Sequence, residues 1–283
     1  MQIINVEKKF DNKKICDYLL YKYPNLNKNT LYKTLRKKDI RVNDNKINEN
    51  VIVHSNDEIK LYIPDEILFS DNTLDIIFED ENILIINKPV GIEVTGESSL
   101  TTKCKKYING FVKPCHRLDR NTTGLVLFAK NEKALNILLE KFKNREIDKY
   151  YKATVYGILP KKQETLESYL FKDTKKSLVY ISDIPKKGYQ KIITIYKVVE
   201  ENAKENTSVL DIKLETGRTH QIRAHLAHIG YPIIGDGKYG INEINKKFNK
   251  KTQLLCSYKL VFNFTTDAGI LNYLNSRNMS ISV

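Results

Sequence analysis

Residues 115–130 read CHRLDRNTTGLVLFAK, and residues 214–240 read LETGRTHQIRAHLAHIGYPIIGDGKYG. In the first stretch, Asp119 lies between Arg117 and Arg120, ahead of a turn-prone NTTG and an apolar run that predicts a strand. An aspartate in such a place is most often a loop acid paired with an arginine. The second stretch decides whether Asp119 does more than that.

The second stretch predicts a helix with clear ends. Thr219 is expected to cap a helix that runs from His220 to Ile229, and the Gly and Pro that follow end it. This spacing places His220 and Arg223 on one face. Two further histidines lie three residues apart, but no carboxylate completes a ligand set, so the pattern argues against zinc.

The region from residue 74 onward alternates short apolar runs with a helix. Residues 132–145 carry apolar side chains at 135, 138, 139 and 142, the spacing of an amphipathic helix. The runs that predict strands are LDIIFED (74–80), NILIINK (82–88), GLVLFAK (124–130), YYKATVYG (150–157), KIITIYKVV (191–199) and VLDIKLE (209–215). This order predicts an α+β fold with a mixed, mainly antiparallel sheet and flanking helices. No glycine-rich nucleotide loop follows any strand, which argues against a dinucleotide-binding fold.

Residues 1–63 are expected to form a separate small unit. Asp11 is a candidate cap for a helix over residues 12–21, and Asn27 or Asn29 for a second helix that ends near Lys38. Short β-prone pieces follow: IRVN, VIVH and EIKLYI. Residues 64–73, with Pro and turn-forming residues, are expected to be a linker to a catalytic domain over 74–283.

The small unit is basic, with 13 Lys and Arg against 8 Asp and Glu in residues 1–63. The second predicted helix and the strand after it resemble the S4 RNA-binding domain, in which such a helix and strand form the RNA surface. The alternative for a charge run of this kind is a solvated face. The resemblance implies that five residues contact RNA: Lys33, Arg36, Lys37, Lys38 and Arg41.

The whole chain of 283 residues carries a formal net charge of +13. Such a surplus suits a partner with a phosphate backbone, and binding through it would be strongly salt-dependent. The four cysteines are scattered, which argues for a reducing compartment, the cytoplasm, and against a zinc ribbon. Neither a membrane span nor a signal peptide is expected, because no apolar run is long enough.

Taken in order, the motifs resemble the RluA-type pseudouridine synthases, and the S4-like part narrows this to the RluC- and RluD-like members that act on large-subunit rRNA. NILIINKPVGIEV at 82–94 is similar to the first family motif, and HRLDRNTTGL at 116–125 to the motif with the catalytic aspartate. KYYKA at 149–153 matches a K-x-Y-x-A pattern. LETGRTHQIRAHL with GYPIIGDGKYG matches the third motif.

The resemblance implies an RNA-modifying isomerase that uses neither a cofactor nor a metal. It makes Asp119 the catalytic carboxylate, Tyr151 the tyrosine of the uracil pocket, and Arg223 the arginine paired with the carboxylate. An arginine at bidentate distance would keep a carboxylate ionised in a dry pocket, where burial favours the protonated form. Arg117 is expected to fill the space left by a flipped base, and a planar guanidinium suits that position.

The C-terminal part departs from the family pattern at one position. Where the family usually has Leu-His-Ala, this chain reads Leu255-Cys256-Ser257. The leucine that packs near the base is kept, and the missing histidine is not the nucleophile. We therefore expect Leu255 to contact the substrate base and Arg218 to contact a phosphate. The change at Cys256 is expected to affect only packing or RNA contacts.

Three alternatives stay open at this point. The leading one is action on 23S rRNA, free or in a pre-50S particle, by a monomer; the second is the same activity on tRNA. A non-catalytic RNA-binding or ribosome-assembly factor is a third, although binding alone has no need for Asp119. A glycosidase acting on free sugars ordinarily needs two carboxylates that flank the bond, and the motif offers one.

Overall fold

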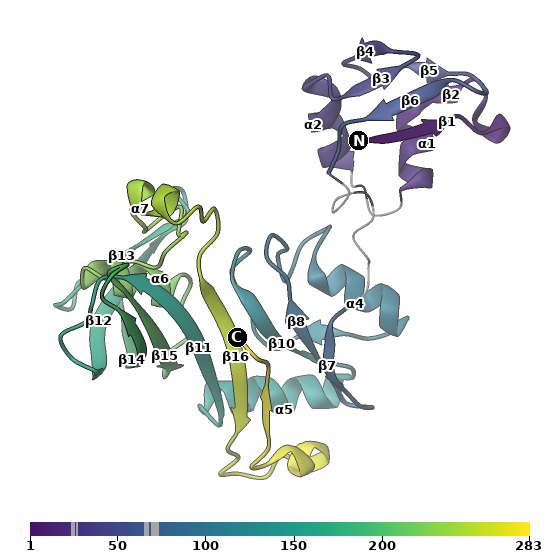
Figure 1. Ribbon diagram of the computed structural model, residues 1–283. Helices are drawn as coiled ribbons and strands as arrows, with labels where there is room; N and C mark the ends of the chain where they lie inside the picture. The colour runs from purple at the N-terminus through teal and green to yellow at the C-terminus, as the bar shows by residue number, and fades with distance from the viewer. Residues whose placement is uncertain (24–25, 27, 65–67, 69–73) are drawn as a thin grey trace. The chain divides into compact units, whose positions relative to one another are not determined.

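The computed structural model of the protein describes residues 1–23, 26, 28–64, 68 and 74–283. The chain divides into two compact units, Met1–Thr73 and Leu74–Val283 (Figure 1). Most of the expected linker lies outside the described residues, although Leu68 is buried in the core of the first unit. No helix within the described ranges is long and apolar enough to cross a membrane.

The first unit is a four-stranded antiparallel sheet in the order β1-β6-β3-β4, joined by two helices and a second, two-stranded sheet. The strands are β1 (Gln2–Asn5), β3 (Ile40–Val42), β4 (Asn45–Ile47) and β6 (Glu58–Leu61), with the pair β2 (Lys13–Lys14) and β5 (Ile52–Val53). The helices are α1 (Ile15–Lys22) and α2 (Lys28–Arg36), preceded by the 3-10 turn η1 (Lys8–Phe10). Apolar side chains of both helices and of the sheet share one buried core.

The helix ends in this unit differ from the prediction. The strand β2 precedes α1, so the helix begins at Ile15, and Asp11 instead accepts the N–H of Ser55 at 2.9 Å. Asp11 is therefore not the cap. Helix α2 ends at Arg36 because Lys38 has a φ of 60°, the left-handed conformation that ends helices. The candidate cap Asn27 lies outside the described residues, and the side chain of Asn29 is not described.

The second unit is built on one large sheet in the order β13-β12-β14-β15-β11-β16-β10-β8-β7, with β17 beside β16 and β9 beside β10. Every pairing is antiparallel except β10 with β16, so the prediction of a mixed, mainly antiparallel α+β fold is confirmed. The strands are β7 (Ile76–Glu79), β8 (Ile83–Lys88), β9 (Lys113–Pro114), β10 (Thr123–Ala129), β11 (Ile147–Tyr156), β12 (Gln163–Asp173), β13 (Leu178–Ser182), β14 (Gln190–Asn202), β15 (Thr207–Leu214), β16 (Leu255–Phe262) and β17 (Asn278–Ser280).

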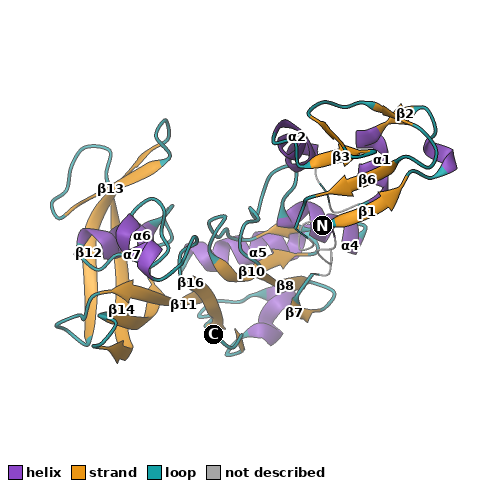
Figure 2. Cartoon of the chain, turned by 45° about the horizontal axis from the view of Figure 1, so that its top comes forward, coloured by secondary structure: helices purple, strands orange, loops and turns teal. Residues whose placement is uncertain are grey.

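Helices cover both faces of this sheet, and alternation along the strands explains why. In β8, Leu84 and Ile86 join one buried core, whereas Ile83 and Ile85 join another. The first core contains residues of α4 (Leu100–Ile108) and α6 (Gln221–His228), and the second contains residues of α5 (Glu132–Lys143) and η2 (Gly269–Leu274). Helix α5 lies along β10, α6 beside β13, and a further helix is α7 (Asn242–Lys247) (Figure 2).

The parallel contact between β10 and β16 sets where the chain before β10 emerges. Gly124 pairs with Ser257, and a Cβ on Gly124 would stand 2.2 Å from the carbonyl oxygen of Ser257. Only glycine allows this approach, and its φ of 104° suits glycine as well. The glycine of the NTTG turn thus fixes the position of the Asp119 loop against the β16 strand.

Candidate active site

A cavity of about 1200 Å³ opens between the two stretches with which the sequence analysis began. The Asp119 loop forms one wall, and the segment that leads into α6 forms the other. Tyr151 of β11 and the last turn of α5 complete the cavity. Leu139 of α5 also lines it, and its side chain is 46% exposed instead of buried in the core. The lining residues include Arg117, Leu118, Asp119, Arg120, Lys149, Tyr151, Arg218, His220, Arg223 and Lys238.

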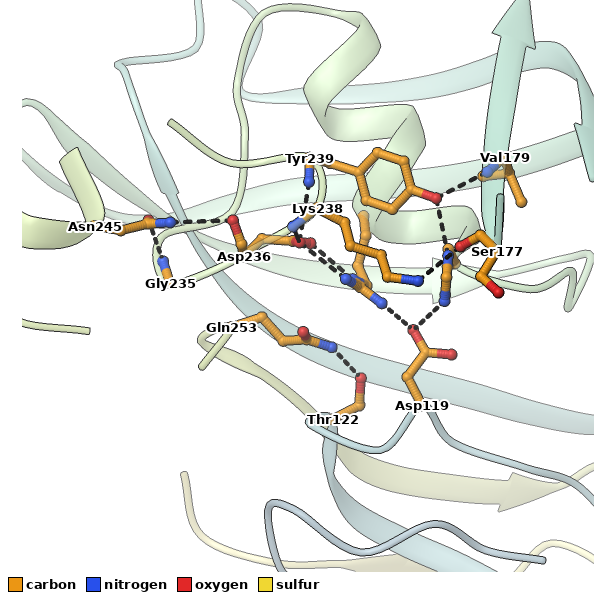
Figure 3. A network of polar contacts seen from close by, with 12 residues as sticks. Asp119, Thr122, Ser177, Val179, Gly235, Asp236, Lys238, Tyr239, Asn245 and Gln253 are labelled. Atoms are coloured by element: carbon orange, nitrogen blue, oxygen red, sulfur yellow. Dashed lines mark hydrogen bonds and ion pairs between the residues drawn. The ribbon is translucent and has the colours of Figure 1, made fainter. Parts of the chain in front are cut away.

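The Asp119 loop, between β9 and β10, is held by side chains from other elements. The N–H of Thr122 donates to the carbonyl of Asp119 at 3.0 Å, and Gln253 donates to the Thr122 hydroxyl at 2.8 Å (Figure 3). Behind it, His116 accepts the N–H of Leu127 at 3.1 Å, and burial lowers the pKa of His116 to about 3. The imidazole is therefore neutral and serves as a fixed acceptor within the loop.

Arg223 lies at the centre of a network of two carboxylates. Its Nη1 donates to Asp119 Oδ2 at 2.8 Å, while Nε and Nη2 donate to Asp236 Oδ2 and Oδ1 at 2.7 and 2.9 Å. The expected pairing with Asp119 is present, but the bidentate contact is made with Asp236 instead. The two bonds to Asp236 thus fix the orientation of the guanidinium. Arg223 donates a single hydrogen bond to Asp119, and only Oδ2 accepts it.

Asp236 was not identified from the sequence. It is fully buried, and besides Arg223 it accepts the N–H groups of Lys238 and Tyr239 at 2.8 and 3.1 Å (Figure 3). Burial raises the pKa of Asp236, and the hydrogen bonds and charge of Arg223 outweigh it and lower the pKa below its ordinary value. Burial also acts against the charge of Arg223, which the two aspartates more than offset, raising its pKa.

Lys88, which ends β8, was also missed. Its side chain is fully buried, and Nζ donates to the carbonyls of Pro89, Ile92 and Arg120 at 2.8, 3.0 and 3.0 Å. Burial lowers the pKa of Lys88 to about 8, and the charge of Asp119 opposes that shift. Three carbonyls from the loops after β8 and before β10 thus accept from one ammonium. The bond to the Arg120 carbonyl holds the backbone directly after Asp119 in place.

Tyr151 and Leu255 line a small recess of about 60 Å³ beside Asp119, together with Thr122 and Ile222. Both side chains are buried, with exposed fractions of 5% each. The β11–β16 register shifts between Tyr150 and Tyr151, a bulge of the kind that re-aims side chains near active sites. Burial raises the pKa of Tyr151, so its hydroxyl keeps its proton at neutral pH.

The rim of the cavity is cationic. Arg117 and Arg218 are both exposed, and they lie on opposite walls. Four lysines also line it: Lys143, Lys149, Lys172 and Lys238. Lys172 comes from β12, a strand that was not predicted. The acidic lining residues are Glu93 and Asp119, so positive charge dominates the entrance.

The start of α6 differs from the prediction. His220, not Thr219, is the N-cap residue, and it makes no side-chain capping hydrogen bond. The helix ends at His228. The two later histidines are engaged elsewhere: His225 contacts the hydroxyls of Thr194 and Ser168 at 3.0 and 3.2 Å, and His228 contacts Asp183 at 2.8 Å.

In the first unit, the five basic residues expected to contact RNA lie on α2 and the segment after it. Lys33, Arg36, Lys37 and Lys38 are exposed. Arg41 differs, because it is half-buried with its guanidinium 5.3 Å from the centre of the Tyr62 ring. Four of the five side chains are therefore exposed to solvent, although Arg36 Nε donates to the carbonyl of Tyr32 at 3.4 Å.

Sheet, flanking helices and a cationic cavity around one arginine-held aspartate define a pseudouridine synthase fold. A human RNA pseudouridylate synthase domain-containing protein 1 structure aligns with a TM-score of 0.60 at 24% identity, over 69% of this chain and 81% of that one. The family model described as RNA pseudouridylate synthase matches residues 82–228. The chain belongs to this family, which confirms the resemblance to RluA-type enzymes and an isomerase activity.

Curated relatives extend the match over nearly the whole chain. A ribosomal large subunit pseudouridine synthase C of Buchnera aphidicola subsp. Acyrthosiphon pisum is 32% identical over 98% of this chain and 97% of its own. A mitochondrial tRNA pseudouridine(32) synthase of Saccharomyces cerevisiae is 31% identical over 84% of this chain and 53% of its own. Relatives named for rRNA and for tRNA are thus both similar to this protein.

Proposed function

We propose that the protein converts specific uridines of 23S rRNA to pseudouridine, with Asp119 as the catalytic carboxylate. The observation that carries this proposal is the carboxylate itself: Arg223 holds Oδ2 at 2.8 Å, and the side chain is 25% exposed toward a cationic cavity. Among the described residues, no side chain or backbone N–H donates to Asp119 Oδ1. One oxygen is thus anchored and the other faces the space that a nucleoside would enter.

The chemistry asks little else of the protein. The N1–C1′ bond of uridine breaks, the base turns, C5 bonds to C1′, and the proton lost from C5 is balanced by one gained at N1. Asp119 begins this sequence either by attacking the nucleoside or by removing a proton from the sugar. Both routes need an ionised carboxylate at a fixed distance, which the Asp119–Arg223 contact supplies.

Tyr151 and Leu255 are proposed to hold the uracil. A flat base fits a recess with an aromatic ring and a branched apolar side chain, and stacking on tyrosine is a common way to bind a flipped base. Because burial keeps the Tyr151 hydroxyl protonated, it acts as a hydrogen-bond donor rather than as a base. A core tyrosine is the alternative role, but Tyr151 lines the cavity that contains Asp119.

Arg117 and Arg218 are proposed to act on the RNA rather than on the reacting uracil. Flipping a stacked uridine costs a few kcal/mol, and a side chain that fills the vacancy recovers part of that cost. Arg117 is exposed two residues from Asp119, where a guanidinium can stack between bases. Arg218, exposed on the other wall, is suited to a phosphate.

The choice of rRNA rests on the first unit and on the relatives. We propose that residues 1–63 form an S4-like domain that binds the phosphates of 23S rRNA or of a pre-50S particle. The cations that bind them are Lys33, Arg36, Lys37, Lys38 and Arg41. We also propose that the protein acts as a monomer. The long match to a large-subunit rRNA enzyme supports this. The yeast relative favours tRNA as the second candidate.

A pseudouridine map of total RNA tests the proposal. Cells with the gene, without it, and rescued by wild type or by Asp119→Ala are compared at single-nucleotide resolution. We expect at least one 23S rRNA uridine to lose its modification without the gene and to regain it only with wild type. Restoration by Asp119→Ala would refute the catalytic role, and loss of a tRNA site alone would refute the substrate.

A further inference from the structure

His220 has an uncommon backbone conformation at the wall of the catalytic cavity. Its φ and ψ are 54° and 16°, in the left-handed region, at the N-cap of α6. No other non-glycine residue with positive φ, among those the structure describes, lines this cavity. The conformation costs free energy, and the residue makes no capping bond in return. What it achieves is to direct the imidazole into the cavity beside Asp119.

Hydrogen bonds to Tyr239 determine which imidazole nitrogen carries the proton. The Tyr239 oxygen accepts the backbone N–H of Val179 at 2.9 Å (Figure 3). The same oxygen lies 2.8 Å from His220 Nδ1. Among the described residues, Nδ1 is the one acceptor within hydrogen-bond distance of this hydroxyl, so we assign the hydroxyl proton to that hydrogen bond. His220 Nδ1 is then the acceptor, and the proton of the neutral ring is on Nε2.

Tyr239 itself is firmly placed. Its backbone N–H is bound to Asp236, and the Arg223 guanidinium lies 5.3 Å from the centre of its ring. The histidine orientation is therefore set by the same buried aspartate that orients Arg223. The tautomer of His220 and the direction of Arg223 share one support.

His220 lines the cavity, and its Nε2–H group has no partner at hydrogen-bond distance within the part of the chain that the structure describes. Asp119 Oδ2 is 3.9 Å away, too far for a hydrogen bond, and that oxygen is already bound to Arg223. Burial lowers the pKa of His220, and Asp119 opposes this while Arg223 and Lys238 reinforce it. The ring is thus neutral at pH 7 and presents an N–H donor beside the reacting carboxylate.

We propose that His220 is a catalytic residue that donates a hydrogen bond from Nε2 to the uracil while the base is detached. The inference rests on the proposed function. When the N1–C1′ bond breaks, its electron pair leaves with the base, and negative charge spreads over N1 and the two carbonyl oxygens. A neutral donor stabilises this charge without giving up its proton, so His220 is unchanged at the end.

Two substitutions, His220→Gln and His220→Asn, distinguish a hydrogen-bond donor role from a purely structural one. The two roles predict opposite orders of activity for these variants. The amide nitrogen of Gln reaches the place of Nε2, whereas that of Asn reaches the place of Nδ1. Asn enters the left-handed region more readily than Gln, so a purely conformational role favours His220→Asn. A donor role at Nε2 favours His220→Gln.

Turnover and thermal stability of both variants are measured on the RNA substrate identified by mapping. We expect kcat of His220→Asn to fall about 100-fold, as for the loss of one donor to a developing anion, with KM within a few-fold of wild type. His220→Gln should retain at least about tenfold more activity than His220→Asn, although its Tm is the same or lower. Equal kcat values, or a higher kcat for His220→Asn, would overturn the proposal.

Tyr239→Phe provides a second measurement. Without the hydroxyl, nothing holds the proton on Nε2, and we expect kcat to fall roughly tenfold, the usual scale for loss of an orienting partner. Tyr196→Phe is the matched control, because its hydroxyl contacts Glu164 and the carbonyl of Lys161, and none of these three residues lines the cavity; it should keep full kcat. Equal kcat for the two variants would also count against the role. An inactive wild type would instead overturn the proposed function and this inference with it.

Discussion

Glu146 and Asp119 are both carboxylates paired with a cation inside the same unit, and they differ in what surrounds them. Glu146 accepts from Lys141 Nζ at 2.7 Å, from the N–H of Thr265 and from the hydroxyl of Thr266, so both its oxygens are occupied, and its side chain is 5% exposed. Asp119 is bound to its arginine through one oxygen and is 25% exposed.

The difference teaches how a buried ion pair is used. A carboxylate whose acceptor sites are filled stabilises the fold, and Glu146 ties the end of α5 to the segment after β16. A carboxylate that is held at one oxygen and open at the other keeps a reactive group in place. Asp119 can leave one oxygen unbound because Arg223 is held in place by another residue. Asp236 accepts the two hydrogen bonds that fix the guanidinium.

The largest effect that probes this comparison is on activity at Arg223. We expect Arg223→Ala to lose about 10³- to 10⁴-fold in kcat, close to the loss from Asp119→Ala, because residues that act as a unit fail together. Single-turnover conversion of uridine measures it, with Arg277→Ala, which lies outside the cavity lining, as control. Near-normal turnover in Arg223→Ala would sink the assignment.

Glu146→Gln is expected to do the reverse, lowering stability and leaving chemistry intact. It leaves the Lys141 ammonium without its counter-ion at a buried site, which costs about 3 kcal/mol in free energy of unfolding. Denaturant titration measures this, with kcat of the folded enzyme as the companion. Asp119→Asn should change stability by less than about 1 kcal/mol. A loss of kcat in Glu146→Gln with unchanged stability would contradict the contrast.

The same variant has a predicted pH signature. The hydrogen bond from Lys141 lowers the pKa of Glu146 from 4.5 to about 2. A carboxylate with a depressed pKa in the folded state adds stability above its unfolded pKa and loses it as pH falls. The stability gap between wild type and Glu146→Gln should therefore be full above pH 5 and shrink between about 4.5 and 2.

Asp236→Asn tests whether the buried aspartate acts through Arg223. The amide can accept only one of the two guanidinium hydrogen bonds, so Arg223 should lose its fixed direction toward Asp119. We expect kcat to fall about 100-fold, with KM within a few-fold. Asp267→Asn, at an exposed aspartate on another loop, is the control. An unchanged kcat would show that Asp119 and Arg223 do not need this support.

The smallest effect is expected at Cys256. Leu255 lines the recess beside Asp119, and the next residue of a strand points to the opposite face, so Cys256 is not among the lining residues. Cys256→Ser should keep kcat within about twofold, whereas Leu255→Ala should lose roughly tenfold from poorer packing of the uracil. A large loss in Cys256→Ser would place the thiol in the site after all.

The contact between Asp119 and Arg223 was predictable because both residues lie in motifs that are specific enough to indicate the family, and the family resemblance implies the pairing. Asp236 was not, although its motif was recognised: it lies beyond the helix and a turn, and a glycine-flanked aspartate is an ordinary turn signal. Only the tertiary fold brings it to Arg223. Lys88 was missed because a lysine at the end of an apolar run is normally the solvated end of a strand.

Elements with a strong apolar period were predictable, such as α5 and β8. The strands β12 and β13 were not, because Ser168 and Ser182 are buried while Phe171 and Tyr180 are exposed, which blurs the alternation of apolar and polar residues. The start of α6 was misplaced by one residue for a different reason. Capping preference favoured Thr219, whereas the structure has His220 in a left-handed conformation that no local rule anticipates.

The most direct test of the central claim is a single-turnover assay of Asp119→Asn on a large-subunit rRNA fragment that contains the mapped uridine, with RNA affinity measured alongside. We expect the variant to bind the fragment within a few-fold of wild type and to leave the uridine unconverted. Conversion at the wild-type rate would contradict the role of the open carboxylate.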